Sequence, residues 1–175
     1  MTFEQIIEKL TGELKASHGV GFEFRTHQID AIKKYLENHH GLYNITCGVG
    51  KTLIQACIAY LEVLRCKEKG IPFTGMFVCH RLMLEDQVKF EYINFFGDFF
   101  KEQKVEFRVL NTTGDNSLEN VARNNMAMPM GENVLYFTTT ASLNDYVKNH
   151  TNKHKDGYDE IKEHIEIIPS DHNID

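Results

Sequence analysis

Several features that define other protein classes are missing from this 175-residue sequence. It has no run of about 18 apolar residues, so we expect no transmembrane helix and no membrane partner. Its N-terminus, MTFEQIIEKL, has early acidic residues and lacks the basic start and apolar core of a signal peptide. Neither an internal repeat nor a low-complexity segment is found. We expect an intracellular, cytoplasmic protein, chiefly because of the cysteine usage described next.

Clustered cysteine and excess positive charge are also missing. The cysteines form no C-x-x-C pair, which argues against a disulfide framework or a zinc site and favours a reducing compartment. They are Cys47, Cys57, Cys66 and Cys79. The formal net charge is −6, whereas a protein that coats nucleic acid would be basic. Any contact with nucleic acid must therefore be local.

What the sequence does contain is an ordinary globular composition with strands and helices in alternation. Apolar residues make up 42% and charged residues 25%, in a chain long enough for one domain with a real core. An apolar face from Phe3 to Leu14 predicts a first helix, and Thr26 is the expected N-cap of a second. Further helices are expected at 53–64, 82–103, 118–125, 141–147 and 158–167, and strands at 41–46, 74–79, 105–110 and 133–139.

This order of elements predicts an α/β fold. Strands that alternate with helices favour a mostly parallel sheet covered by helices on both faces. The 53–64 segment is apolar almost all round, which is typical of a buried helix. Phe95, Phe96, Phe99 and Phe100 could stack nucleic-acid bases, but at helical spacing they favour a core or docking role.

The stretch TCGVGKT, residues 46–52, carries the strongest chemical signal. Glycines let the backbone wrap an anion without Cβ clashes, and a helix that begins there points its N–H groups and positive dipole end at the same anion. Lys51 can reach the β- and γ-phosphates, and Thr52 can offer its hydroxyl to Mg²⁺. Lys51 and Thr52 are thus the expected catalytic residues, within an ATP-binding set of Cys47, Gly48, Val49, Gly50, Lys51 and Thr52.

The alternative is an ordinary surface turn. G-x-G-K-[ST] arises by chance in a chain of this length with a probability of roughly 1% or less. The full phosphate-loop pattern asks for a small residue at position 45, and this chain has Ile45. The short form from Gly48 to Thr52 is intact, and the flanking strand and helix are those that the motif requires. We therefore favour phosphate binding over the surface turn.

Together with three further segments, the glycine turn resembles the first motor domain of superfamily 2 helicases and translocases, the RecA-like P-loop ATPases. DEAD/DEAH-like proteins, restriction-type translocases and repair or viral helicases all fit this resemblance. The first segment is FRTHQIDAI, residues 24–32, which is similar to their R-x-x-Q-x-x-A element. The resemblance implies that Gln28 reads the adenine edge, with Arg25 near the base. A solvated amide on an amphipathic helix is the alternative.

The other two segments resemble elements that touch nucleic acid. FVCHRLMLEDQ, residues 77–87, is similar to motif Ia, which implies that His80 and Arg81 contact the phosphate backbone. YFTTTASL, residues 136–143, is similar to motif Ib or Ic, which implies phosphate contacts from Thr139 and Thr140. The alternatives are an ordinary strand–helix junction for the former and helix capping for the latter.

The acidic motif D-E-x-H or D-E-x-D, which binds Mg²⁺ and orients water in these motors, is not found. We therefore expect residues 1–40 to be N-terminal helices with the adenine element. Residues 41–175 are expected to be a first RecA-like lobe truncated before the acidic motif, with the second motor lobe of the same protein missing. Such a fragment should bind ATP and Mg²⁺ weakly and hydrolyse ATP negligibly.

Three functions are compatible with the motifs. The first is an ATP-dependent nucleic-acid helicase or translocase, with DNA preferred to RNA as the partner. The second is a small nucleotide or metabolite kinase, although about 40 residues precede the glycine turn here, whereas the first strand of such kinases usually lies near the N-terminus. The third is a nucleotide- and nucleic-acid-binding module without catalysis. The glutamine element upstream of the turn favours the motor.

Overall fold

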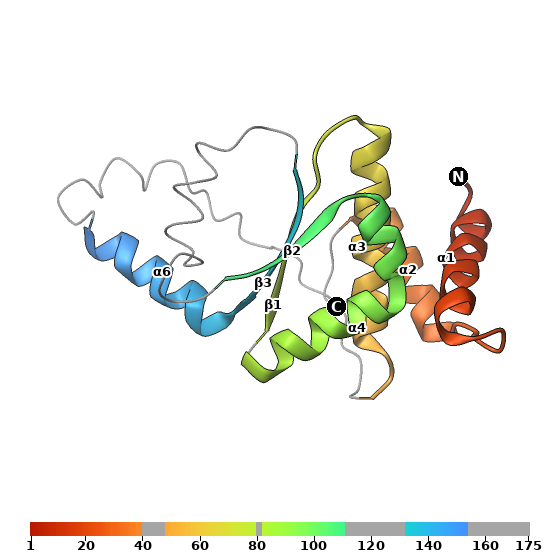
Figure 1. Cartoon of the computed structure of the whole chain (residues 1–175), viewed down its shortest axis with the longest axis horizontal. Coiled ribbons are helices and arrows are strands. Elements are labelled where there is room, and N and C mark those ends of the chain that lie inside the picture. Colours follow the sequence, from red (N-terminus) through yellow and green to blue (C-terminus); the bar gives the residue numbers. More distant parts are fainter. Residues whose placement is uncertain (40–47, 80–81, 111–131, 154–175) are drawn as a thin grey trace, which may run out of the picture.

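The structure is a computed structural model that describes residues 1–39, 48–79, 82–110 and 132–153. Within these ranges, five helices and three strands follow one another along the chain (Figure 1). They are α1 (Phe3–His18), α2 (Thr26–Asn38), α3 (Lys51–Glu68), β1 (Thr74–Cys79), α4 (Leu82–Glu102), β2 (Val105–Val109), β3 (Asn133–Thr139) and α6 (Thr140–Lys153). The elements expected at 41–46, 118–125 and 158–167 lie outside the described residues.

Helix α1 begins and ends at residues suited to those positions. The Thr2 hydroxyl accepts a hydrogen bond from the Gln5 N–H at 3.4 Å, and the Gln5 side chain accepts one from the Thr2 N–H at 2.9 Å. This reciprocal capping box satisfies two N–H groups at the helix start. Gly19 follows the last turn with φ 97°, a conformation that costs glycine little. The expected apolar face is confirmed, because Leu10 and Leu14 are fully buried.

The start of helix α2 differs from the expected one. Thr26 was expected to cap this helix, but it is the first helical residue, and Arg25 occupies the N-cap position with extended backbone (φ −78°, ψ 151°). The reason is the third helical residue, Gln28, whose Oε1 accepts the Arg25 N–H at 2.9 Å. A side chain that reaches back from this position ties the helix start in place of a threonine hydroxyl.

Helix α3 is longer than expected and lies at the centre of the helical layer. It packs against α2 on one side and α4 on the other (Figure 1). The expected burial is confirmed, since most of its apolar side chains are inaccessible to solvent. They are Leu53, Ile54, Ala56, Cys57, Ala59, Tyr60, Leu61 and Val63. A helix held on several sides in this way keeps its N-terminus in a fixed place.

The described sheet is parallel throughout, with the strand order β1-β3-β2 (Figure 1). Strand β3 is central, and its residues Val134–Thr139 are all buried, as expected of a parallel strand covered on both faces. Cys79 of β1 pairs in register with Thr139 of β3. The predicted α/β fold with a parallel sheet is confirmed, and the bounds of β1 and β3 are those expected from the sequence.

Aromatic side chains join the helices to one face of the sheet. Tyr92 of α4 lies edge-on to Phe137 of β3, with ring centroids 5.7 Å apart. Tyr60 of α3 lies 3.8 Å from Phe99 of α4. The expected core role of the phenylalanine cluster is confirmed for its three buried members, Phe96, Phe99 and Phe100. Such aromatic packing contributes beyond the burial of apolar area and fixes the helices on the sheet.

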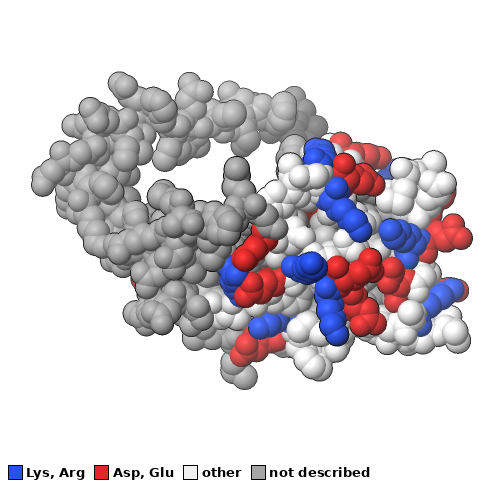
Figure 2. Space-filling model, turned by 45° about the horizontal axis from the view of Figure 1, so that its top comes forward, with Lys and Arg blue, Asp and Glu red and all other residues white. Residues whose placement is uncertain are grey.

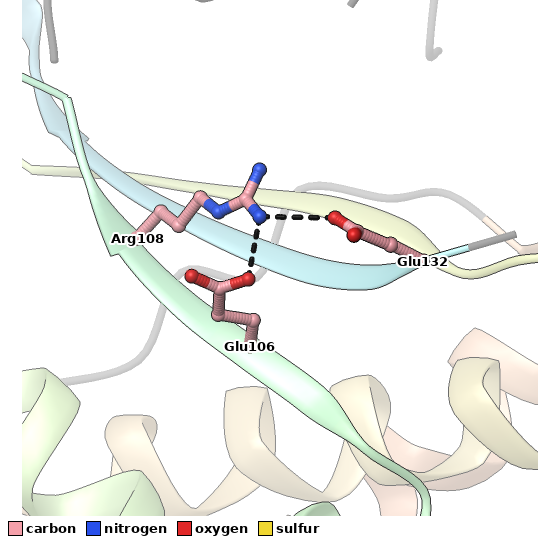
Figure 3. A network of polar contacts seen from close by, with 3 residues as sticks. All are labelled: Glu106, Arg108 and Glu132. Carbon is pink, nitrogen blue, oxygen red and sulfur yellow. Dashed lines mark hydrogen bonds and ion pairs between the residues drawn. The ribbon is translucent and has the colours of Figure 1, made fainter. Parts of the chain in front are cut away.

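The opposite face of the sheet carries an ion-pair network. Arg108 of β2 donates to Glu106 of the same strand at 2.5 Å and to Glu132, directly before β3, at 3.0 Å (Figure 3). The hydrogen bond from Arg108 holds the pKa of the Glu106 carboxyl below its usual range. More than half of each glutamate side chain is exposed, so each pair contributes only about 0–1 kcal/mol.

Charges of both signs are mixed on one face of the described part of the molecule. In Figure 2, lysine and arginine lie among aspartate and glutamate over the described part of the face shown. This mixture agrees with the expectation that nucleic-acid contacts are local, because a polyanion-coating face would carry one sign. Among the described residues, no helix is both long and apolar enough to cross a membrane.

Candidate nucleotide-binding site

The glycine turn leads directly into the N-terminus of α3. Gly50 is the N-cap, with φ 87° and ψ 37°, and Gly48 has φ 80°. Both values lie in the left-handed region, which glycine adopts without the strain that a side chain brings. The turn therefore requires glycine at these two positions. Cys47, the residue before the turn, lies outside the described residues.

The first turn of α3 is suited to an anion. It contains no acidic residue, and its N-cap, Gly50, has no side chain that could occupy the first N–H groups. The first N–H groups of an α-helix lack intrahelical partners and carry partial positive charge. Lys51 and Thr52 are the first two residues of α3, so their ammonium and hydroxyl groups both belong to its N-terminal end. Lys51 is exposed and Thr52 is half-buried. The sequence prediction of a turn followed by a helix is confirmed here, whereas phosphate binding by these residues remains a prediction.

The start of helix α2 reaches the glycine turn. The carbonyl oxygen of Val49 receives a hydrogen bond from Nε2 of Gln28 at 3.2 Å and lies 3.0 Å from Nε2 of His27. Gln28 is buried, with 5% of its surface exposed. The two segments that the sequence assigned to adenine and phosphate are thus in direct contact, although 21 residues separate Gln28 from Val49.

The buried amide of Gln28 keeps some hydrogen-bonding capacity. Its Oε1 accepts the Arg25 N–H, and its Nε2 donates to Val49. A primary amide has two N–H donors and two acceptor lone pairs, so one of each remains. The adenine N6/N7 edge offers the complementary acceptor and donor. The internal bonds of Gln28 are therefore compatible with the expected adenine contact, which remains a prediction.

A pocket of about 390 Å³ opens between these two segments. This volume lies in the range of small-molecule sites. It is lined by Gly21, Phe22, Glu23, Arg25, Gln28, Gly48, Val49, Gly50 and Leu53. The lining thus includes five residues of the expected nucleotide-binding set, namely Arg25, Gln28, Gly48, Val49 and Gly50. Lys51 and Thr52 follow Gly50 directly in the sequence.

Sequence reasoning missed the contribution of the segment before Arg25. Phe22 lines the pocket and lies edge-on to Phe24, with ring centroids 5.1 Å apart. The alternating GFEF stretch, residues 21–24, could have signalled an extended segment with aromatic residues on one side. A larger cavity of about 640 Å³ lies between α1, α4 and β2, but neither the turn nor the start of α2 lines it.

The residues expected to bind nucleic acid belong to the C-terminal edge of the sheet. Thr139 ends β3 and is buried, and its hydroxyl accepts the Ser142 N–H at 3.2 Å. This bond caps α6, which is the alternative reading of the threonine segment. Thr140 is the first residue of α6 and is half-buried. The register of Cys79 with Thr139 brings the ends of β1 and β3 side by side. His80 and Arg81 lie outside the described residues.

Comparison with known proteins identifies the family. Residues 21–168 match the family described as the type III restriction enzyme, res subunit. The chain belongs to this family. Membership confirms the expected resemblance to the first motor domain of superfamily 2, and it favours this reading over the kinase. No match is found among curated proteins.

A solved structure supports the same fold. It is a nuclease-deletion mutant of the type ISP restriction-modification enzyme LlaGI in complex with a DNA substrate mimic. Its TM-score with the present chain is 0.50, and the two sequences are 14% identical. The alignment covers 75% of this chain and 14% of that one, so the chain spans a small part of the larger enzyme's length. The RecA-like class of the sheet and helices is therefore confirmed.

Proposed function

We propose that this restriction-family chain binds ATP with Mg²⁺ between the glycine turn and the start of α2, as part of a motor that moves on DNA. The observation that carries the proposal is the contact of His27 and Gln28 with the Val49 carbonyl. It makes one pocket from an adenine-type element and a phosphate-type turn that are distant in sequence.

The phosphate end of ATP would lie over the N-terminus of α3. Backbone N–H groups from Cys47 to Gly50 would surround the phosphates, and the positive end of the 18-residue helix would attract them. The Lys51 ammonium would neutralise the β- and γ-phosphates. The Thr52 hydroxyl would bind Mg²⁺, an ion that prefers oxygen ligands and coordinates few protein groups beside the phosphates.

The base would enter the pocket on the α2 side. Gln28 would offer its remaining N–H and lone pair to the adenine edge, and Arg25, which is exposed at the pocket wall, would lie near the base. Phe22 adds an aromatic surface to the same pocket. Stacking on an aromatic ring suits a flat purine.

Nucleic acid would lie along the carboxyl edge of the sheet. The C-terminal ends of parallel strands are where ligands bind in open α/β sheets, and β1 and β3 end there together. Thr140, together with His80 and Arg81, would contact phosphates, while Thr139 would hold the start of α6. DNA is the favoured strand, because the LlaGI structure contains a DNA substrate mimic.

The proposal is tested first by nucleotide binding. The affinity of the chain for a fluorescent ATP analogue is measured in the presence of Mg²⁺, for the wild type and for Lys51→Ala. Lys67→Ala is the matched control, because it removes the same exposed charge from the last turn of the same helix. We expect Lys51→Ala to weaken binding about tenfold or more, since charge-assisted phosphate contacts are strong, and Lys67→Ala to have no effect.

Hydrolysis separates a motor from a binding module. Phosphoryl transfer depends on positioned charges, so we expect negligible turnover by this chain alone and DNA-stimulated turnover by the longer protein.

Three outcomes would contradict parts of this proposal. Equal nucleotide binding by the wild type and Lys51→Ala would contradict the phosphate site. Robust turnover by the isolated chain that Lys51→Ala abolishes would contradict the expected need for further catalytic groups. Stimulation by RNA in place of DNA would reverse the choice of strand.

A further inference from the structure

His27 is a second donor to the glycine turn, and none of the motifs assigns it a role. Its ring is half-buried, and Nε2 lies 3.0 Å from the carbonyl oxygen of Val49. Gln28 donates to the same oxygen at 3.2 Å. A carbonyl oxygen has two lone pairs, so both donors can be accommodated. Two adjacent side chains of α2 therefore hold one peptide group of the turn.

This pair of hydrogen bonds fixes the direction of the Val49–Gly50 peptide. The peptide is trans, so its C=O and N–H point in opposite directions. With the carbonyl oxygen held by α2, the N–H of Gly50 points away from α2. The Gly50 carbonyl then accepts the Ile54 N–H at 3.2 Å, the first bond of helix α3. The clamped peptide is thus the last one before the helix.

Without these two hydrogen bonds, the Val49–Gly50 peptide could adopt a second orientation. Gly48 and Gly50 flank Val49, and glycine populates positive and negative φ about equally, so little resists a rotation of the peptide plane. The rotated peptide would present a carbonyl oxygen in place of an N–H to an anion. A partial negative charge beside a phosphate is repulsive, whereas an N–H is attractive.

We propose that His27 is a positioning residue of the phosphate site, which holds the Val49–Gly50 peptide so that its N–H faces the phosphates. This inference rests on the proposed function. The bond needs hydrogen on Nε2, which both the neutral Nε2–H tautomer and the imidazolium provide.

The test uses two donor-free variants and one rescue variant of the whole chain. His27→Phe keeps the ring and removes the donor, and His27→Met is a second donor-free side chain. His27→Gln restores an N–H at a similar reach. Affinities for ATP and for inorganic tripolyphosphate, both with Mg²⁺, are measured by competition with a fluorescent nucleotide, and melting curves establish that each variant is folded.

Because the clamp acts on the phosphate end alone, ATP and tripolyphosphate should lose the same factor. We expect about 3- to 10-fold weaker binding of both ligands by the donor-free variants, as for the loss of one hydrogen bond, and recovery in His27→Gln. Unchanged affinity, loss for ATP alone, or failure of His27→Gln to recover would overturn the role of His27. Absence of ATP binding by the wild type would overturn the proposed function itself, and the role of His27 with it.

Discussion

The side-chain amide of Gln28 lies against Gly50, in the space that a Cβ at position 50 would occupy. At Gly48, the other glycine of the turn, no atom of the described residues lies within 4 Å of the equivalent point. Both residues have positive φ, 87° and 80°. Replacing either glycine by alanine therefore strains the backbone, but only at position 50 does the new Cβ also meet another side chain. The two substitutions can thus be compared as a matched pair.

We expect Gly50→Ala to lower the free energy of unfolding more than Gly48→Ala. The positive φ should cost each variant about 1–2 kcal/mol, and only Gly50→Ala must also displace the buried Gln28 amide. Urea denaturation of the two variants measures the difference. In a Gln28→Ala background the excess should vanish, as a double-mutant cycle would report. Equal losses in both backgrounds would contradict the contact between Gln28 and the turn.

The hydroxyl of Thr139 is predicted to stabilise the start of α6. It accepts the Ser142 N–H at 3.2 Å, so Thr139→Val should lower the free energy of unfolding by about 1 kcal/mol, the usual cost of a lost N-cap. Thr139→Ser keeps the hydroxyl and should lose less. Thr140→Ala, at the adjacent half-buried residue, is the control for a change that leaves the cap intact. A Thr139→Val variant as stable as the wild type would show that the cap is unimportant.

Asn133 should be required for the packing of the strand starts. Its Oδ1 accepts the Phe73 N–H at 2.8 Å, and its Nδ2 donates to the Gln103 carbonyl at 2.7 Å. Asn133→Ala leaves both backbone groups without this partner, and we expect a loss of about 1–3 kcal/mol in chemical denaturation. Glu132→Ala changes the preceding, exposed residue and should cost far less. Similar losses for the two variants would indicate that the amide bonds add nothing specific.

The ion pair of Glu106 predicts a small dependence of stability on pH. Hydrogen bonding by Arg108 lowers the pKa of Glu106 in the folded chain, so the unfolded chain binds a proton first as the pH falls. The contribution is complete above the unfolded pKa and is lost as the pH falls through the folded pKa. At pH 7, Glu106→Gln should therefore cost about 1 kcal/mol or less, because the side chain is mostly exposed.

This pH dependence is measured by urea denaturation at several values from neutral to acidic pH. The wild type and Glu106→Gln should converge at the acidic end. In an Arg108→Met background, the change in stability caused by Glu106→Gln should be smaller throughout. A gap that widens toward acidic pH would show that the sign of the Glu106 contribution has been assigned wrongly.

Local patterns in the sequence were sufficient for much of the fold. The bounds of β1 and β3 follow from short apolar runs between polar residues, and the buried helix α3 follows from its continuous apolar surface. Helix boundaries were less predictable. Thr26 has the hydroxyl of an N-cap, but Gln28 competes with it from the third helical position, and the choice depended on a side-chain bond that no pattern reports.

The candidate site divides in the same way. The glycine turn could be predicted because its chemistry is contained in five consecutive residues, from Gly48 to Thr52. The roles of Phe22 and His27 could not, because each depends on where the segment before α2 lies relative to the turn. Helix α2 is placed by its packing on α3, and α3 by its packing on α4.

By itself, the sequence determined the kinds of element, their order, and a phosphate-type turn at the head of a helix, since these depend on interactions between residues close in the chain. Only the tertiary structure decided the strand order β1-β3-β2 and the meeting of α2 with Val49. Both depend on which apolar surfaces bury one another across long stretches of chain. The hydrophobic effect is non-directional, so the pattern of apolar residues in the sequence shows which surfaces are buried. It does not show which surface packs against which.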